Sequence, residues 1–74
     1  MIAVYVLIKV ESGEAWRIAE KVSMMDGVKM THTVTGVYDI IAYAELENFE
    51  ALKDLISSIQ SIKGVERTHT AVSI

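Results

Sequence analysis

The sequence has no cysteine, no basic excess and no apolar run long enough to span a membrane, and each absence excludes a class of protein. Without cysteine there are neither disulfides nor thiolate metal ligands. The formal net charge is −3 with no basic stripe, which argues against direct nucleic-acid binding. The longest apolar run, Met1–Ile8, is far shorter than the ~20 residues of a transmembrane helix, and it lacks the basic flank of a signal peptide. We therefore expect a cytoplasmic protein that binds no membrane.

Recognisable catalytic motifs are also missing. The chain has no nucleophile elbow, no phosphate-binding glycine loop and no metal-carboxylate motif. Its acidic residues are mostly spread over expected helix surfaces and strand ends, where carboxylates are usually solvated. We expect no catalytic residues, no metal and no cofactor, so the chain is not predicted to be an enzyme.

The chain of 74 residues has room for one domain, residues 1–74. Half of the residues are apolar, too many for a disordered segment. A chain this short buries only roughly 60% of the surface of its unfolded state, so small domains usually need disulfides, a metal or a partner subunit. With cysteine absent, self-association is the expected source of additional stability.

An internal repeat divides the chain into halves 1–37 and 38–74. Gly27–Thr33 recurs as Gly64–Thr70, 37 residues later, with five of seven positions identical. The same offset superimposes the apolar positions of the two segments with helical spacing. Both halves therefore have to satisfy one packing scheme.

The apolar patterns predict strands over 2–10, 28–35, 40–46 and 65–73. Runs 2–10 and 40–46 are the most apolar and suit the centre of a sheet, whereas the threonine- and histidine-bearing runs suit its edges. In the strand over 28–35, strict alternation places Val28, Met30, His32 and Val34 on one face.

Two helices are predicted between these strands, with apolar stripes from Ala15 to Met25 and from Phe49 to Ile62. Ser12 and Asn48 are the expected N-caps. Right-handed crossovers then give an α+β, ferredoxin-like βαββαβ domain. Its four-stranded antiparallel sheet has the order 4-1-3-2, with two helices on one face.

Two helices cover only one face of such a sheet, and the other face should be polar in a soluble monomer. Here both faces of the central strands carry apolar side chains, including Tyr5 and Tyr43. The uncovered face is then a larger apolar patch than monomers usually expose. We expect a homodimer formed through the sheet face, in the manner of a dimeric α/β barrel; the alternative is a further domain that covers this face.

His32 and His69 are the only histidines and occupy equivalent repeat positions. On opposite edges of the sheet they would be roughly 14 Å apart, at three strand spacings, which is too far to share a metal ion within one chain. The expectation is a structural role for both, with a metal site across subunits and a pH-sensing or ligand role left open.

The segment Thr35–Asp39 is the candidate binding loop. Gly36 allows backbone torsions from which amides can converge on a ligand, and Asp39 could pair with an ammonium group. The alternative is a plain hairpin turn, with Gly36 at positive φ and Asp39 accepting turn amides. Thr68 and Thr70 share one face of the last strand and offer hydroxyls, although threonines are common on edge strands.

With these residues in place, the chain resembles the RAM domain, the effector-binding half of leucine-responsive/AsnC-type (Lrp/AsnC) transcription regulators. The resemblance covers essentially the full length. It is closest to the stand-alone form of that domain, and its most specific element is the Gly-x-Tyr-Asp segment Gly36–Asp39, followed by the apolar run Ile40–Ala42.

The resemblance implies dimers that pair through the sheet face, often assembled into octameric rings, and an amino-acid effector held at a subunit interface. The implied ligand contacts are loop groups, the Asp39 carboxylate for the effector's amino group, and two hydroxyls of the last strand: Gly36, Val37, Tyr38, Asp39, Thr68 and Thr70. No helix-turn-helix accompanies them, so DNA binding is not carried over. An influence on transcription would be indirect, through co-assembly with full-length relatives.

The leading hypothesis is thus an amino-acid-binding regulatory module. A small enzyme of the dimeric α/β-barrel type would need a roomy cavity and polar groups facing the dimer axis. A purely structural assembly module, or an ACT-type regulatory module, is the remaining alternative.

Overall fold

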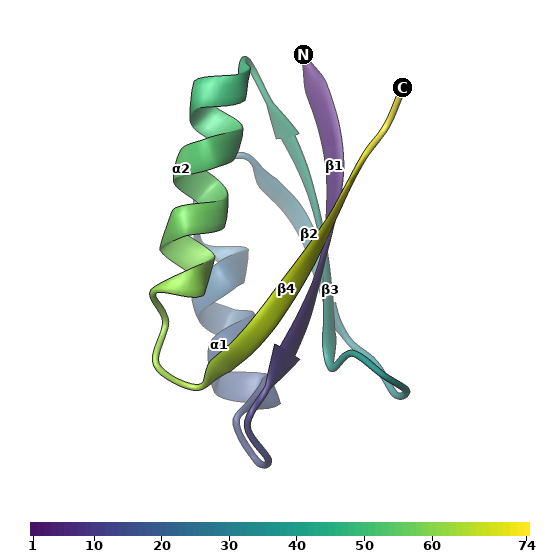
Figure 1. The fold of residues 1–74 in the computed structure, drawn as a ribbon, viewed down its shortest axis with the longest axis vertical. Coiled ribbons are helices and arrows are strands. Elements are labelled where there is room, and N and C mark those ends of the chain that lie inside the picture. Colours follow the sequence, from purple (N-terminus) through teal and green to yellow (C-terminus); the bar gives the residue numbers. More distant parts are fainter.

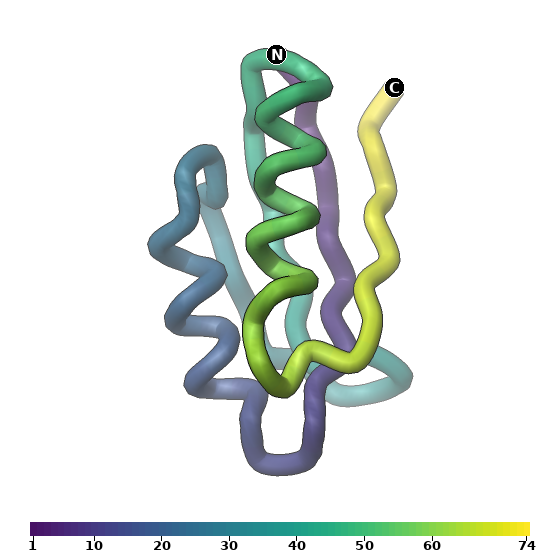
Figure 2. The backbone as a smooth tube through the Cα atoms, turned by 60° about the vertical axis from the view of Figure 1, so that its left-hand side comes forward, coloured from purple at the N-terminus to yellow at the C-terminus, as the bar shows by residue number.

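The computed structural model describes all 74 residues and has the predicted order of elements (Figure 1). The elements are β1 (Ile2–Val10), α1 (Ala15–Ser23), β2 (Val28–Thr33), β3 (Ile40–Leu46), α2 (Phe49–Gln60) and β4 (Val65–Val72). The sheet is antiparallel with the order β2-β3-β1-β4, which is the predicted 4-1-3-2 order counted from the other edge. Both helices lie on one face of this sheet, and in Figure 2 the tube shows them side by side in front of it. The ferredoxin-like prediction is confirmed.

The core lies between the helices and one face of the two central strands. All of its 13 buried residues are apolar, and no polar or charged residue is buried among them. Every second residue of β1 and β3 points to the helices, as the two-residue period of a strand requires. Each large side chain buried in this way contributes about 1.5–3 kcal/mol relative to exposure. The fully buried aliphatic positions are Val4, Val6, Ile8, Ile18, Val22, Ile40 and Ile59.

Each edge strand contains a β-bulge, and this makes the strict alternation predicted for residues 28–35 wrong. Val28 pairs with Ala44, but Met30 already pairs with Tyr43, so Lys29 is the extra residue. A bulge residue shifts the side chains that come after it by one position. Val28 therefore lies on the helix side, whereas Met30 and His32 lie on the open face. The strand also ends at Thr33, two residues earlier than expected.

The bulge of β4 occurs at the equivalent repeat position, Glu66. Val65 pairs with Val10 and Arg67 with Lys9, so Glu66 has no partner in the ladder. Arg67 and His69 consequently lie on the open face, while Thr68 and Thr70 pair with the buried Ile8 and Val6. The polar residues of β4 are thus divided between the two faces of the sheet.

The repeat has two offsets, since α2 is longer than α1. Val65 follows its counterpart Val28 by 37 residues, but their strand partners, Ala44 and Val10, are only 34 residues apart. Helix α2 has 12 residues and α1 has nine, which accounts for the three-residue difference. The repeat unit extends from the ends of the helices through the edge strands.

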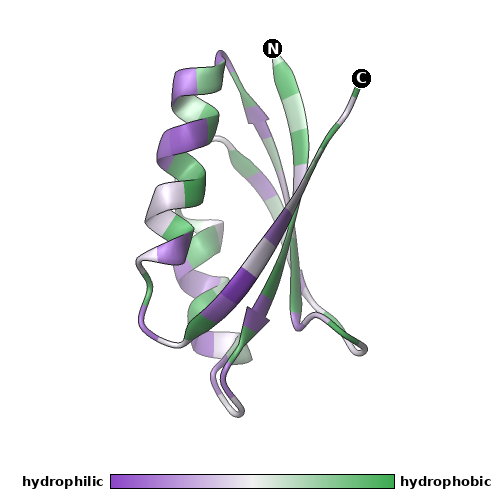
Figure 3. Ribbon diagram, in the orientation of Figure 1, coloured by the Kyte–Doolittle hydropathy of each residue, from purple (hydrophilic) through white to green (hydrophobic).

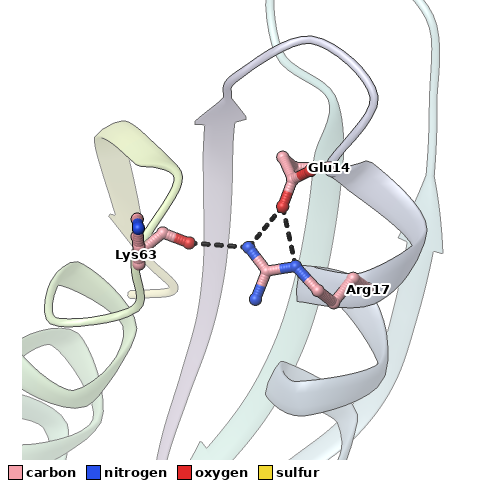
Figure 4. A network of polar contacts seen from close by, with 3 residues as sticks. All are labelled: Glu14, Arg17 and Lys63. Carbon is pink, nitrogen blue, oxygen red and sulfur yellow. Dashed lines mark hydrogen bonds and ion pairs between the residues drawn. The ribbon is translucent and has the colours of Figure 1, made fainter.

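Helix α1 begins later than expected, because the chain first turns at Gly13, which has φ +84°. The N-cap is Glu14, without a side-chain cap bond, so the assignment of Ser12 is wrong. Glu14 instead accepts from Arg17 Nε at 2.7 Å, and Arg17 also donates to the Lys63 carbonyl at 2.8 Å. Figure 4 shows this guanidinium joining the start of α1 to the turn before β4.

The predicted cap of α2 is confirmed: the Asn48 side chain accepts from the Ala51 amide at 2.9 Å. Its predicted apolar stripe begins too early, however. Phe49, the first residue of the helix, is 70% exposed, whereas Leu55 and Ile59 are buried. A side chain in the first turn of this helix lies beyond the part of the stripe that covers the sheet.

Candidate functional site

The face of the sheet away from the helices is apolar at its centre. Tyr5 and Tyr43 pair across β1 and β3, with ring centroids 5.0 Å apart, and Leu7 pairs with Ile41 beside them. Tyr5 is nevertheless 45% exposed, because no element of the chain covers this face. In Figure 3 the central strands are largely coloured as hydrophobic. The predicted uncovered apolar face is present.

The two histidines lie in one row across this face. His32 pairs with Ile41, Ile41 with Leu7, and Leu7 with His69, so the rings belong to opposite edges of the sheet. This confirms the edge positions from which a wide separation was expected. No group of three or more histidine, cysteine, aspartate or glutamate side chains is arranged to hold a metal ion.

The loop Val34–Asp39 bends to the open-face side at one end of the sheet (Figure 1). It is closed by a bond from the Val34 amide to the Asp39 carbonyl at 2.8 Å. Gly36 has φ +115°, a conformation that favours glycine, and no atom lies within 4 Å of where its Cβ would be. Val37 is 68% exposed. The tip of the loop is therefore free to contact another molecule.

Asp39 anchors the other end of the loop to β1. Its amide donates to the Ile8 carbonyl at 2.9 Å, and its Oδ2 accepts from the Val10 amide at 2.9 Å. Lys9 Nζ lies 3.4 Å from the same oxygen. The Val10 hydrogen bond, with a smaller contribution from Lys9, holds the pKa of Asp39 below its usual range. The carboxylate accepts a hydrogen bond from a backbone amide, as the turn interpretation expected. This amide belongs to Val10 of β1, however, and not to the turn itself.

Tyr38 extends from the loop across β1 to the open side of β4. Its ring centroid is 6.4 Å from that of His69, and the guanidinium carbon of Arg67 lies 5.6 Å from the Tyr38 centroid. Lys9 pairs with Arg67 in the ladder. We call this group the loop corner: loop Val34–Asp39 with Lys9, Arg67 and His69.

The structure does not bring Thr68 and Thr70 into the loop corner. Both come after the bulge on the helix side, and the Thr68 hydroxyl accepts from Gln60 Nε2 of α2 at 3.0 Å. Their role as ligand contacts remains a prediction. Lys9 and Arg67 were missed as site residues, whereas a ligand role for His69 had been left open. The only available signal for the missed pair was Glu66, a charged residue at the bulge position in the repeat.

A groove of about 740 Å³ lies at the opposite end of β3, between the end of α1 and the first half of α2. Its lining is acidic and includes Asp26, Glu45, Glu47 and Asp54. None of the predicted site residues lines it. The groove and the loop corner are therefore separate features.

No helix of this structure combines the length and the apolarity that crossing a bilayer requires.

Comparison with known proteins places this geometry in a family. Residues 3–74 match the model of the Lrp/AsnC ligand binding domain. The HTH-type transcriptional regulator FL11 of Pyrococcus furiosus is 32% identical over 71 residues, which are 96% of this chain but 47% of the regulator. The chain thus spans about half the length of the curated relatives it matches first.

A solved structure and a short segment of an enzyme are also similar to this chain. The structure of TTHA0845 from Thermus thermophilus has a TM-score of 0.95 and 33% identity, and the match covers 100% of this chain and 94% of that one. Homocitrate synthase of Sulfolobus acidocaldarius is 29% identical over 55 residues, 74% of this chain and only 12% of the enzyme. The match over residues 3–74, together with the fold, shows that the chain belongs to the Lrp/AsnC ligand-binding domain family.

Proposed function

We propose that residues 1–74 form a regulatory module that binds a small molecule, a free amino acid, at the loop corner. The observation that carries this proposal is a loop that is held at its base and free at its tip. Asp39 holds it to β1, while Gly36 and Val37 extend beyond an apolar face that no element of the chain covers. Because the loop is already held in place, few of its groups lose conformational freedom when a ligand binds, and the entropic cost of binding is small.

The module works as an assembly in this proposal. A second copy of the chain covers the open face around Tyr5 and Tyr43, since removing such a patch from water is the main gain from association. The dimer places the loop corner at the edge of the interface, and dimers assemble further into rings, octamers among them. The bound amino acid then contacts groups from more than one subunit.

The influence on transcription is indirect. The 74 residues include no helix-turn-helix, and their net charge of −3 does not favour DNA. The module would act in the cytoplasm by co-assembling with full-length regulators of its family, which supply the DNA-binding part.

A thermal-shift screen with the twenty L-amino acids tests the binding function. A ligand that binds only the folded assembly raises stability by RT ln(1 + [L]/Kd), so at least one amino acid should raise Tm at millimolar concentration. If none of the twenty changes Tm, the chain is not an amino-acid sensor.

Gly36→Ala locates the site, with Gly13→Ala as its matched control. Both glycines have positive φ, and no atom lies within 4 Å of either added Cβ. Both variants should lose similar stability from backbone strain, about 1–2 kcal/mol. Only Gly36→Ala should weaken the binding of the amino acid found in the screen. Equal affinity of the two variants would place the site away from the loop.

A further inference from the structure

The two arginines of the chain are in contrasting situations. Arg17 is engaged by the Glu14 carboxylate and by the Lys63 carbonyl (Figure 4). Arg67 makes neither a side-chain hydrogen bond nor an ion pair with any other residue. Its five N–H donors are therefore available to a ligand.

Arg67 is also held in position. Its guanidinium carbon lies 5.6 Å from the centre of the Tyr38 ring, within the range of a cation–π contact. A guanidinium that rests on an aromatic ring keeps its in-plane donors free and loses less freedom when it binds. The ring belongs to the proposed binding loop, so Arg67 and the loop are positioned together.

The charges around Arg67 leave it uncompensated. Asp39 is the acidic residue of the loop, but its Oδ2 already accepts from the Val10 amide and pairs with Lys9. His69, whose ring centroid is 6.4 Å from that of Tyr38, is the next polar side chain of the open face along β4. The loop corner is thus locally cationic on a chain of net charge −3.

We infer that Arg67 binds the carboxylate of the ligand at the loop corner, and that the site selects molecules with a free carboxylate. This inference rests on the proposed function and specifies the chemistry of its ligand. A planar guanidinium fits a carboxylate through two parallel N–H···O bonds, which an amide or an ester cannot accept equally well. Free amino acids are therefore bound more tightly than their α-carboxamides.

The test is isothermal titration of the full chain with the twenty free L-amino acids and, in parallel, with their α-carboxamides (L-leucinamide, L-methioninamide and so on). Four proteins are compared: wild type, Arg67→Gln, Arg67→Lys and Lys29→Gln. Lys29 is exposed at the bulge of the other edge strand, so Lys29→Gln makes the same change in net charge away from the loop corner.

For the amino acid that binds, Arg67→Gln should raise Kd about 10- to 100-fold, the loss expected for a hydrogen-bonded ion pair. The Kd of Arg67→Lys should lie between those of the wild type and Arg67→Gln, because lysine keeps the positive charge but lacks the planar guanidinium. Lys29→Gln should stay within about twofold of wild type, since exposed charges far from a site act weakly. With the wild type, the carboxamide should bind more weakly than the free acid by a similar factor. With Arg67→Gln, the free acid and the carboxamide should have nearly equal Kd values, since both changes remove the same contact.

Two results would overturn the inference alone: equal Kd values for Arg67→Gln and Lys29→Gln, or wild-type affinity for the carboxamides equal to that for the free acids. In either case the proposed function would stand. If no free amino acid binds the wild type, the proposed function and the inference both fail. A melting temperature of Arg67→Gln close to that of Lys29→Gln shows that any lost affinity does not come from unfolding.

Discussion

The two edge strands, β2 and β4, show how one sequence motif serves two purposes. Each comes after a glycine of positive φ, contains one bulge at the same repeat position and continues as Thr-His-Thr. Their neighbours differ. The residue after the bulge is Met30 in β2 and Arg67 in β4, and only Arg67 meets the ring of Tyr38. The repeat specifies the path of the backbone, whereas the surroundings determine what its side chains bind.

The equivalent threonines, Thr31 and Thr68, illustrate the same contrast. Thr68 accepts from Gln60, at the end of α2. The counterpart of Gln60 in α1 is Ser23, a shorter side chain that donates to the Glu20 carbonyl instead. The Thr31 hydroxyl is consequently buried without a hydrogen-bond partner. The buried, unpaired hydroxyl of Thr31 therefore destabilises the first copy of the motif, whereas the hydroxyl of Thr68 in the second copy is hydrogen-bonded.

The largest expected difference in stability between the two copies concerns the glycines that precede the edge strands, Gly27 and Gly64. A Cβ on Gly27 would overlap Leu46 Cδ2 and lie 3.0 Å from the Glu45 carbonyl oxygen, whereas a Cβ on Gly64 would meet the side chains of Ile18 and Arg17 at 3.1 and 3.2 Å. Gly64→Ala should cost about 1–2 kcal/mol through its left-handed backbone. Gly27→Ala should cost about 1–3 kcal/mol more through overpacking. Urea unfolding at one fixed protein concentration measures both, and equal costs would show that the two turns tolerate a Cβ alike.

A smaller difference, of opposite sign in the two strands, is expected when each threonine is replaced by valine. Thr31→Val should raise the free energy of unfolding by about 1 kcal/mol, because it removes an unsatisfied buried hydroxyl. Thr68→Val should lower it by about 0.5–1 kcal/mol through loss of the Gln60 bond. Thermal unfolding of the two single variants at equal concentration is sufficient. A change of the same sign in both would contradict the contrast.

The smallest effect concerns the loop after β2, which Asp39 anchors. Since the folded-state pKa of Asp39 is lowered, its ion pair and hydrogen bond stabilise the protein above the unfolded pKa of about 3.9. That stability is lost as pH falls through the lower, folded-state value. Asp39→Asn should therefore lose less stability than wild type between about pH 5 and 2. Asp54→Asn, at an exposed position of α2 without a hydrogen bond or ion pair, is the control and should match the wild-type profile.

The fold was predictable because its signals are local and repeated. The apolar runs of β1 and β3, the cap at Asn48 and the recurrent Gly-Val motif each specify one element, and the crossover rule leaves few arrangements. The open apolar face was predictable from the number of layers, since two helices cover only one side of the sheet.

The candidate site was predictable only in part. The loop was recognised from Gly36 and Asp39, but its partners on β4 depend on the bulge at Glu66, which a strict two-residue period cannot represent. Because Glu66 is an extra residue in the strand, His69 lies on the open face where a strict period would have placed Thr68. The contact between Tyr38 and Arg67 joins residues 29 positions apart, so no local pattern indicates it.

Sedimentation velocity of the ligand-free wild type at low micromolar concentration tests most directly whether a second copy covers the open face. We expect a species of at least twice the 8.2 kDa of one chain, and its conversion to single chains by Tyr43→Lys, which places a charge at the centre of the apolar face. A well-folded wild-type species of 8.2 kDa would contradict an assembly through the sheet and a binding site shared between subunits.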